Sequence, residues 1–151
     1  MIKKVCVFCS SSDLLDEAYH KAASLLGCLL AKKNFDLIFG GGARGLMGAV
    51  SRSCTQNGGK VLGFMPEFLR KLEGSELDDQ HLQIVDTMHV RKQKMYDHSD
   101  AFIVLPGGFG TLDELFEILG WRQLELHTKP IIVIDILSYW KPLKNLFDSV
   151  I

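Results

Sequence analysis

The sequence predicts an α/β fold: a doubly wound, Rossmann-like parallel sheet of about six strands with helices on both faces. Short apolar runs alternate with longer segments of helical periodicity along the 151 residues, which is the pattern of repeated βα units. The short runs are apolar throughout, as expected for strands that are buried on both faces. Two of them end in glycine-rich turns that lead into a helix, a placement typical of nucleotide-binding sheets.

The first half of the chain is expected to hold three strands and two helices. Strands are predicted at 4–9, 35–39 and 60–65, and helices at 16–33 and 45–57. The second helix should close at Gly58-Gly59, because paired glycines stop a helix. Residues 66–81 are polar and irregular, so no regular element is expected there.

The second half repeats the alternation. Strands are predicted at 82–86, 101–105 and 130–136, and helices at 88–99, 111–126 and 139–150. Ligands of such sheets bind beyond the carboxyl ends of the strands, which places the segments 10–13, 40–45, 66–73 and 106–111 on one rim. No internal repeat or low-complexity linker is present, so residues 1–151 are expected to form a single domain.

Composition and charge exclude several classes of protein. The chain has 17 Lys and Arg residues against 18 Asp and Glu residues, a net charge of −1, which gives no footprint for nucleic-acid binding. The 47% hydrophobic content argues against disorder. The apolar runs are shorter than the ~18–20 residues of a membrane span, and the run after Lys3-Lys4 is too short for a signal peptide. We therefore expect a cytoplasmic protein with no membrane or nucleic-acid partner.

The four cysteines are interpreted as structural. Cys6 and Cys9 have CxxC spacing but lie in a predicted strand, where residues three apart face opposite sides of the sheet. Cys28 and Cys54 add no second CxxC motif, and the five histidines show no HExxH spacing, so neither a redox pair nor a metal site is expected.

The first glycine loop, Gly40-Gly41-Gly42, is followed by Gly45 and Gly48 in a GxGxxG pattern. This pattern is weak evidence for a dinucleotide, because it follows the second strand and the acidic residue expected ~20 positions later is replaced by Lys60. Close helix packing accounts for Gly45 and Gly48. Three consecutive glycines exceed that need and favour the close approach of a ligand.

The second glycine loop, at 106–111, is the more informative one. Pro106-Gly107-Gly108-Phe109-Gly110 brings bare backbone N–H groups to a predicted helix N-terminus, where an anion such as phosphate binds well. A competing interpretation is a capping box formed by Thr111 and Glu114. Capping accounts for the threonine and one carboxylate, but it does not require the preceding glycines.

Arg91 and Lys92 lie in the first turns of a predicted helix, where the helix dipole disfavours cations. A solvated basic face is the ordinary interpretation of such residues, and a functional Arg91 is the alternative. No GxSxG or Cys/His signature indicates acyl-transfer chemistry.

Three motifs taken together resemble a known family. The first glycine loop with Gly45-Leu46-Met47-Gly48, the segment Met88-His89-x-Arg91-Lys92-x-x-Met95 and the pattern PGGxGTxxE at 106–114 resemble the LOG ("lonely guy") family of cytokinin riboside 5′-monophosphate phosphoribohydrolases. The likeness extends from Val5 to the C-terminus. Some members carry the label lysine decarboxylase, but no pyridoxal-phosphate architecture is recognisable in this chain.

The resemblance implies hydrolysis of the N-glycosidic bond of AMP or an N6-prenylated AMP, without metal or cofactor, at a site shared by a homodimer. It implies Arg91 and Glu114 as the catalytic pair. It implies substrate contacts by Glu73, Lys92, Gly108, Phe109, Gly110, Thr111, Gly41, Gly42 and Met95. Glu67, which is closer to Pro66, is the residue most easily confused with Glu73.

The sequence departs from the family pattern at a few positions. Ser10 and Asn34 stand where members usually have glycine, Gly120 stands where many have threonine, and the chain ends at Ile151. Asparagine tolerates the left-handed conformation, so that change is mild, whereas Ser10 adds a side chain near the expected pocket.

Two other functions remain open at the level of sequence. One is a non-catalytic nucleotide or molybdenum cofactor carrier, which would keep the glycine loops but would not need Arg91 together with Glu114. The other is a regulatory binding module, which only the fold supports. The joint presence of the arginine and the glutamate favours the enzyme.

Overall fold

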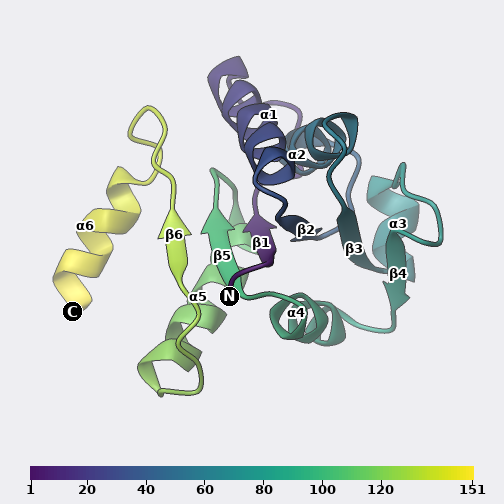
Figure 1. Cartoon of the computed structure of the whole chain (residues 1–151). Helices are drawn as coiled ribbons and strands as arrows, with labels where there is room; N and C mark the ends of the chain where they lie inside the picture. Colours follow the sequence, from purple (N-terminus) through teal and green to yellow (C-terminus); the bar gives the residue numbers. More distant parts are fainter.

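A computed structural model describes all residues, 1–151, and its sheet has six strands, all parallel. Neighbouring strands follow the order β4-β3-β2-β1-β5-β6 (Figure 1). The strands are β1 (Lys4–Phe8), β2 (Asp36–Phe39), β3 (Val61–Pro66), β4 (Leu82–Val85), β5 (Ala101–Val104) and β6 (Ile131–Val133). The α/β fold predicted from the alternating pattern is confirmed.

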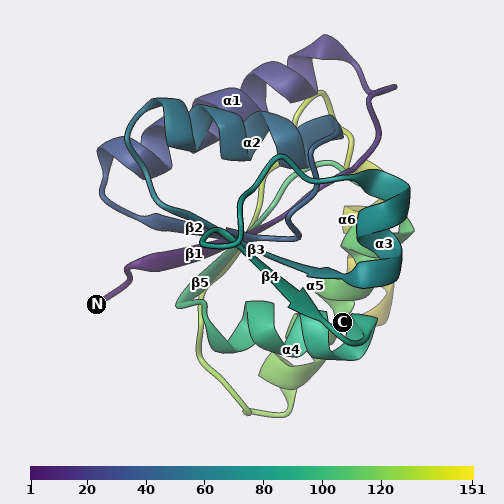
Figure 2. The ribbon, with the colours of Figure 1, turned by 90° about the vertical axis from the view of Figure 1, so that its right-hand side faces the viewer.

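The helices cover the sheet on both faces (Figure 2). They are α1 (Glu17–Lys32), α2 (Gly45–Gln56), α3 (Glu67–Glu73), α4 (Met88–Asp97), α5 (Phe109–Gln123) and α6 (Lys141–Val150). Helices α1 and α2 lie together on one face, and α4 and α5 lie on the other. This is the doubly wound arrangement.

Two hydrophobic cores hold these layers together. Under α1 and α2, residues such as Leu30 and Val50 pack on Leu37 and Phe39 of β2. On the opposite face, side chains from α4, α5 and α6 pack on β1 and β5; they include Met95, Leu115, Ile118, Leu143, Phe8 and Phe102. Strands buried on both faces need apolar residues throughout, which explains the continuous runs in the sequence.

The two cysteines of the CxxC pattern belong to different cores. Cys6 packs in the core under α4 and α5, and Cys9 packs in the core under α1 and α2. All four cysteines are free thiols. Burial raises the pKa values of the Cys6 and Cys9 thiols above their usual range, with a further contribution from the Glu114 carboxylate. Because the two thiols lie in cores on opposite faces of the sheet, the prediction that they diverge from each other is confirmed.

The order of the strands reverses between β1 and β5. Consecutive strands β1 to β4 run outward on one side of this point, whereas β5 and β6 run outward on the other. The connections leaving β1 and β5 therefore separate toward opposite faces and leave a crevice at the carboxyl edge, where ligands bind in sheets of this kind. The segments that enter this crevice are 9–12 and 106–111.

Helix α3 corrects one prediction. Residues 66–81 were expected to be irregular, but Glu67–Glu73 form a short helix that ends at Gly74 with a φ of 70°. None of its residues is buried. Phe68, Leu69 and Leu72 have helical spacing, but the helix has only seven residues, fewer than the window of about 11–18 in which periodicity is recognised. Its consequence for the site is that Glu73 occupies the last helical turn. Asn34, as expected, adopts the left-handed conformation, with a φ of 60°.

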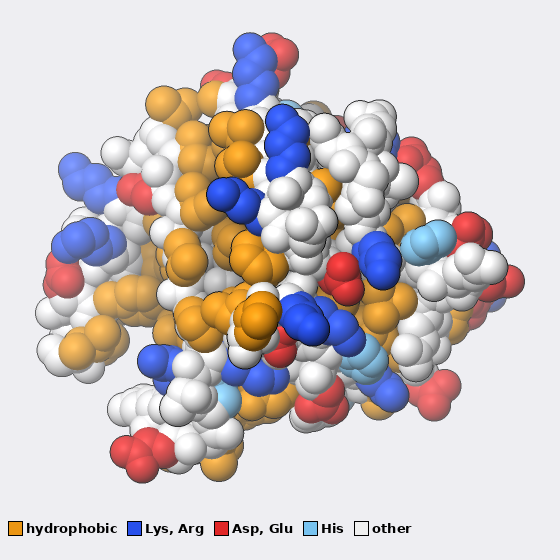
Figure 3. Space-filling view, in the orientation of Figure 1, with side chains coloured by type: hydrophobic (Ala, Val, Ile, Leu, Met, Phe, Trp, Pro, Cys, Tyr) orange, Lys and Arg blue, Asp and Glu red, His pale blue; other side chains and the backbone are white.

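Basic and acidic side chains are interspersed on the face drawn in Figure 3. This distribution agrees with the net charge of −1 and gives no continuous basic stripe on that face. Among the helices, none combines the length and the apolar character that a crossing of the bilayer demands.

Candidate active site

A pocket lies at the point where the strand order reverses. Its volume is about 360 Å³. The pocket is lined by the segments that follow β1 and β5, by α3, and by the first turns of α2, α4 and α5. The lining residues are Cys9, Ser10, Ser11, Ser12, Met47, Leu69, Glu73, Met88, Arg91, Gly108, Phe109, Gly110, Thr111 and Glu114. Both residues predicted as the catalytic pair, and five of the residues predicted to bind substrate, line this one pocket.

Arg91 enters the pocket from α4 and is buried. Its Nε donates a hydrogen bond to the Phe64 carbonyl oxygen at 2.8 Å, and its Nη2 donates to the Gly40 carbonyl oxygen at 2.6 Å. These carbonyls lie at the ends of β3 and β2, so the sheet itself fixes the guanidinium. A side chain at position 40 would overlap the guanidinium. This contact gives a physical reason for glycine there.

Glu114 enters from α5, and its carboxyl group opens into the same pocket. Burial raises its pKa from 4.5 to about 7. Arg91 and Lys92 lower this pKa, whereas Asp113 and Glu117 raise it, and burial outweighs the two cations. A carboxyl group with a pKa near neutrality can exchange a proton during a reaction at physiological pH.

The loop before α5 has a defined shape. The Tyr139 hydroxyl donates to the Gly107 carbonyl oxygen at 2.7 Å, and any side chain at Gly107 would collide with Thr111. The N-cap of α5 is Gly108, and no side chain caps the helix. The capping box considered for Thr111 and Glu114 is therefore absent, which leaves the first N–H groups of α5 available to an anion.

Glu73 reaches the pocket from the end of α3. Its Oε2 is shielded from solvent and has no hydrogen-bond partner in the protein. A buried acceptor without a donor costs free energy. The hydroxyl group of a bound ligand is a suitable donor for this oxygen.

The turn after β1 ties the two glycine loops together. The Ser10 N–H donates to the Pro106 carbonyl oxygen at 3.0 Å, and the Ser10 carbonyl accepts from the N–H groups of Leu46 and Met47. The Asp13 carboxylate accepts from the Gly45 N–H at 2.8 Å. Ser10 thus occupies the pocket wall, with its hydroxyl accepting from the Ser12 N–H at 3.0 Å.

Lys92, Gly41, Gly42 and Met95 are not among the residues that line this pocket. Met95, which was expected to contact substrate, is 1% exposed and packs in the core with Phe102: four residues after Arg91, its side chain faces the sheet and does not line the pocket. Lys92 turns toward α5. Gly41 accepts a hydrogen bond from the Ser75 hydroxyl at 2.7 Å.

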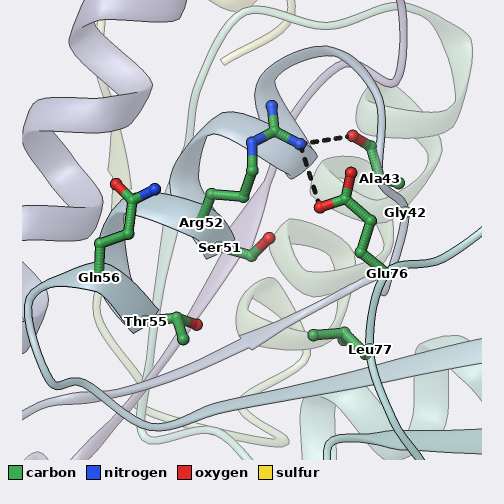
Figure 4. Close-up of a pocket in the computed structure, with 8 residues that line it drawn as sticks. All are labelled: Gly42, Ala43, Ser51, Arg52, Thr55, Gln56, Glu76 and Leu77. Atoms are coloured by element: carbon green, nitrogen blue, oxygen red, sulfur yellow. Dashed lines mark hydrogen bonds and ion pairs between the residues drawn. The ribbon is translucent and has the colours of Figure 1, made fainter.

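Gly42 borders a second, smaller pocket on the far side of its loop (Figure 4). There Arg52 of α2 donates from Nη1 to the Ala43 carbonyl oxygen at 2.9 Å, and the same atom lies 3.6 Å from Oε2 of Glu76. These contacts brace the glycine loop against α2 and against the segment that follows α3.

Several residues of the main pocket were missed by the sequence analysis. Cys9, Ser11, Ser12, Met47, Leu69 and Met88 line it without having been selected. Met47 and Met88 lie within motifs that the sequence analysis assigned to the site. That their side chains point into the pocket could be learned only from the fold. No group of three or more histidine, cysteine or acidic side chains is placed to hold a metal ion.

Comparisons with known proteins identify the family of the chain. The family described as "Possible lysine decarboxylase" matches residues 47–151. A cytokinin riboside 5′-monophosphate phosphoribohydrolase of Arabidopsis thaliana is 42% identical over 151 residues, covering 99% of this chain and 69% of that protein. A rice protein (Oryza sativa subsp. japonica) named as a probable enzyme of the same kind is 42% identical over 149 residues, and the chain spans only 61% of its length.

Solved structures share the fold. The molybdenum cofactor binding protein of Rippkaea orientalis superposes with a TM-score of 0.74 over 99% of this chain and 86% of that one, at 23% identity. The molybdenum cofactor carrier protein of Chlamydomonas reinhardtii gives a TM-score of 0.74 over 99% of this chain and 87% of its own, at 18% identity. At these identities the likeness concerns the fold alone.

Proposed function

The chain belongs to the family of cytokinin riboside 5′-monophosphate phosphoribohydrolases, and from this premise we propose that it hydrolyses the N-glycosidic bond of an adenosine 5′-monophosphate. The products are the free base, adenine or an N6-modified adenine, and ribose 5-phosphate. The enzyme is thus a hydrolase that acts on N-glycosyl bonds.

One observation carries the proposal: Arg91 and Glu114 line the same pocket as the N-terminus of α5. A phosphate group needs N–H donors and positive charge, and the free N–H groups of Gly108, Phe109 and Gly110 together with the Arg91 guanidinium supply both. A ribose whose C1′–N9 bond is breaking needs a nearby carboxylate, and Glu114 supplies it.

The chemistry follows from these groups. As the C1′–N9 bond breaks, its electron pair leaves with the base and positive charge develops on the ribose ring. An ionised Glu114 stabilises that charge and accepts a proton from the water that attacks C1′. The hydroxyl of the water remains on ribose 5-phosphate, and the proton is returned to the base. Glu73 accepts a hydrogen bond from a ribose hydroxyl through its unpartnered Oε2.

The family description as a possible lysine decarboxylase names a different reaction. A decarboxylase that uses pyridoxal phosphate forms a Schiff base with a lysine side chain. No lysine lines the pocket, so its residues do not fit that cofactor. The proposed hydrolysis needs only water as a co-reactant.

The substrate, assembly and location belong to the same proposal. The apolar side chains of Met47, Leu69 and Met88 suit the planar base of AMP or its N6-prenylated form.

The chain acts as a homodimer in the cytoplasm, with α4 and α5 packed against the same helices of the second copy. Exposed Val90 and Phe116 on these helices support such packing.

A non-catalytic carrier is the competing function, because proteins that bind or carry molybdenum cofactor share the fold. A carrier needs the glycine loops for phosphate but has no use for a carboxyl group of near-neutral pKa beside a fixed arginine. The pairing of Glu114 with Arg91 therefore favours the enzyme over the carrier.

The proposal is tested by incubating the purified chain with AMP and with isopentenyladenosine 5′-monophosphate and measuring the free base. Glu114→Gln should lower kcat at least about a hundredfold, because it removes the acceptor of the proton. The matched control is Glu17→Gln on the exposed start of α1, which should behave as the original chain does. Tight binding of a phosphorylated ligand without release of base by the original chain would favour the carrier.

A further inference from the structure

Lys92 follows Arg91 on α4 but faces a different partner. Its Nζ lies 2.8 Å from Oε2 of Glu117 and 3.1 Å from Oδ2 of Asp113, both on α5. The Lys92 side chain is 13% exposed and that of Glu117 is 26% exposed, so this pair is shielded from water more than an ordinary surface pair, whereas Asp113 is exposed. Its donors are committed to the two carboxylates.

The positions of the three residues along their helices are informative. Lys92 is adjacent to Arg91, and Asp113 and Glu117 lie one residue before and three residues after Glu114. The ion pairs therefore join the two helices at the turns that carry the predicted catalytic pair. Figure 2 shows α4 and α5 on the same face of the sheet.

One turn further from the pocket, another contact joins the two helices. Tyr96, in the last turn of α4, packs edge-to-face on Trp121 of α5 with the ring centroids 4.9 Å apart. The aromatic contact holds the last turn of α4, and the Lys92 ion pairs hold the turn before it, nearer the pocket. Loss of the second contact frees the catalytic turns to move apart.

We propose that Lys92 is a positioning residue that holds the catalytic turn of α5 against α4 and thereby fixes Glu114 relative to Arg91, whose guanidinium the sheet already holds. This inference rests on the proposed function of the pocket. It differs from the role that the family resemblance implied for Lys92, which was contact with the substrate.

The electrostatics around Glu114 supply an independent readout. The groups that face it are Arg91 and Lys92 from α4, Asp113 and Glu117 from its own helix, Glu73 from α3, and the thiols of Cys6 and Cys9 from β1 and the turn after it. Lys92 lowers the pKa of Glu114, whereas Glu117 raises it. Substitutions of these two residues should therefore move the Glu114 titration in opposite directions while breaking the same contact.

The experiment compares Lys92→Met, Lys92→Arg and Glu117→Gln, with Lys144→Met as the control. Lys144 forms an exposed ion pair with Asp148 in α6. The pH dependence of kcat and KM is measured with AMP, and the Glu114 carboxyl is titrated by carbon-13 NMR without substrate, with its signal assigned through Glu114→Gln.

Lys92→Met and Glu117→Gln should both lower kcat roughly tenfold to a hundredfold, because a small displacement of reacting groups is costly, and KM should change less. The acidic limb of the profile should move to higher pH in Lys92→Met and to lower pH in Glu117→Gln. Lys92→Arg should recover most of the lost activity, and Lys144→Met should match the original chain.

Unchanged kcat together with an unchanged Glu114 titration in Lys92→Met overturns the inference. A raised KM with an unchanged kcat also overturns it, because that result indicates direct substrate binding. If the original chain releases no base, the proposed function fails. The NMR titration still decides the role of Lys92, since an unshifted Glu114 midpoint in Lys92→Met overturns it in that case too.

Discussion

Two side chains of the pocket, Arg91 and Glu114, are prepared for charge in different ways. The arginine is surrounded by carbonyl oxygens that accept its hydrogen bonds. The glutamate is buried, which disfavours its charged form and raises its pKa to about 7. A fixed cation beside a carboxyl group of near-neutral pKa is an arrangement that binds an anion and moves a proton.

The raised pKa of Glu114 has a consequence for stability. A carboxyl group whose folded pKa exceeds its unfolded value binds more protons in the folded state, so the ionisation of Glu114 costs no stability below pH 4.5 and lowers stability progressively as pH rises through 7. A shift from 4.5 to about 7 corresponds to an upper bound of about 3 kcal/mol.

Glu114→Gln should therefore stabilise the fold at pH 8 by up to about 3 kcal/mol relative to the original chain, and much less at pH 4.5. Urea denaturation at the two pH values measures this difference. Glu17→Gln, at an exposed site, serves as the control and should show no such dependence. Equal effects of Glu114→Gln at both pH values contradict the raised pKa.

The role of Arg91 was within reach of sequence reasoning, whereas that of Lys92 was not. Cations in the first turns of a helix oppose its dipole, and this local conflict marked both residues. Their different directions depend on where α5 lies, which no local pattern encodes. For the same reason Met95, in the same motif as Arg91, was expected at the substrate but lies in the core.

Among the elements, the glycine-rich turn before α5 contains one glycine that the loop shape requires and one that it does not. A side chain at Gly107 meets Thr111, whereas one at Gly110 meets no atom within 4 Å. Gly107 is thus needed for the shape of the loop. Gly110 lies in the helix, where alanine is conformationally favoured.

Gly107→Ala should therefore destabilise the protein by about 1–3 kcal/mol through overpacking. Gly110→Ala should leave stability unchanged or raise it by about 0.4–1 kcal/mol. Thermal or denaturant unfolding of the two variants measures the contrast. Equal destabilisation by both substitutions would show that the loop geometry does not depend on the contact between Gly107 and Thr111.

Most elements were predictable because the strands are continuous apolar runs and the segments between them are long enough to hold a helix. The exception, α3, has no buried residue and only seven residues, too few for the spacing of Phe68, Leu69 and Leu72 to indicate a helix. The capping box at Thr111 failed for another reason: α5 begins two residues earlier, at Phe109, because glycine rather than a polar side chain provides its N-cap.

At the scale of the whole molecule, the order of the strands matters more than any single motif. It places the turn after β1 beside the loop after β5, although the two segments are far apart in sequence. Sequence patterns located both segments on one rim. The contribution of Asp13, which fixes the start of α2 through the Gly45 N–H, emerges only when the strands are ordered.

The proposed homodimer is also a property of the whole molecule. If α4 and α5 pack against a second copy, Val90→Asp on the exposed face of α4 should convert the dimer to a monomer, because it buries an unpaired charge. Sedimentation velocity measures the mass. Leu25→Asp, at an exposed position of α1 on the opposite face of the sheet, is the control. A monomeric original chain contradicts the proposed assembly.

Cleavage of the N-glycosidic bond in this pocket is best tested by measuring both reaction products in the same sample. The chain is incubated with AMP or isopentenyladenosine 5′-monophosphate, and the free base and ribose 5-phosphate are quantified together. Hydrolysis should yield equal amounts of the two products with the original chain, and Glu114→Gln should form neither. Release of free base at the same rate by Glu114→Gln and by the original chain would contradict it.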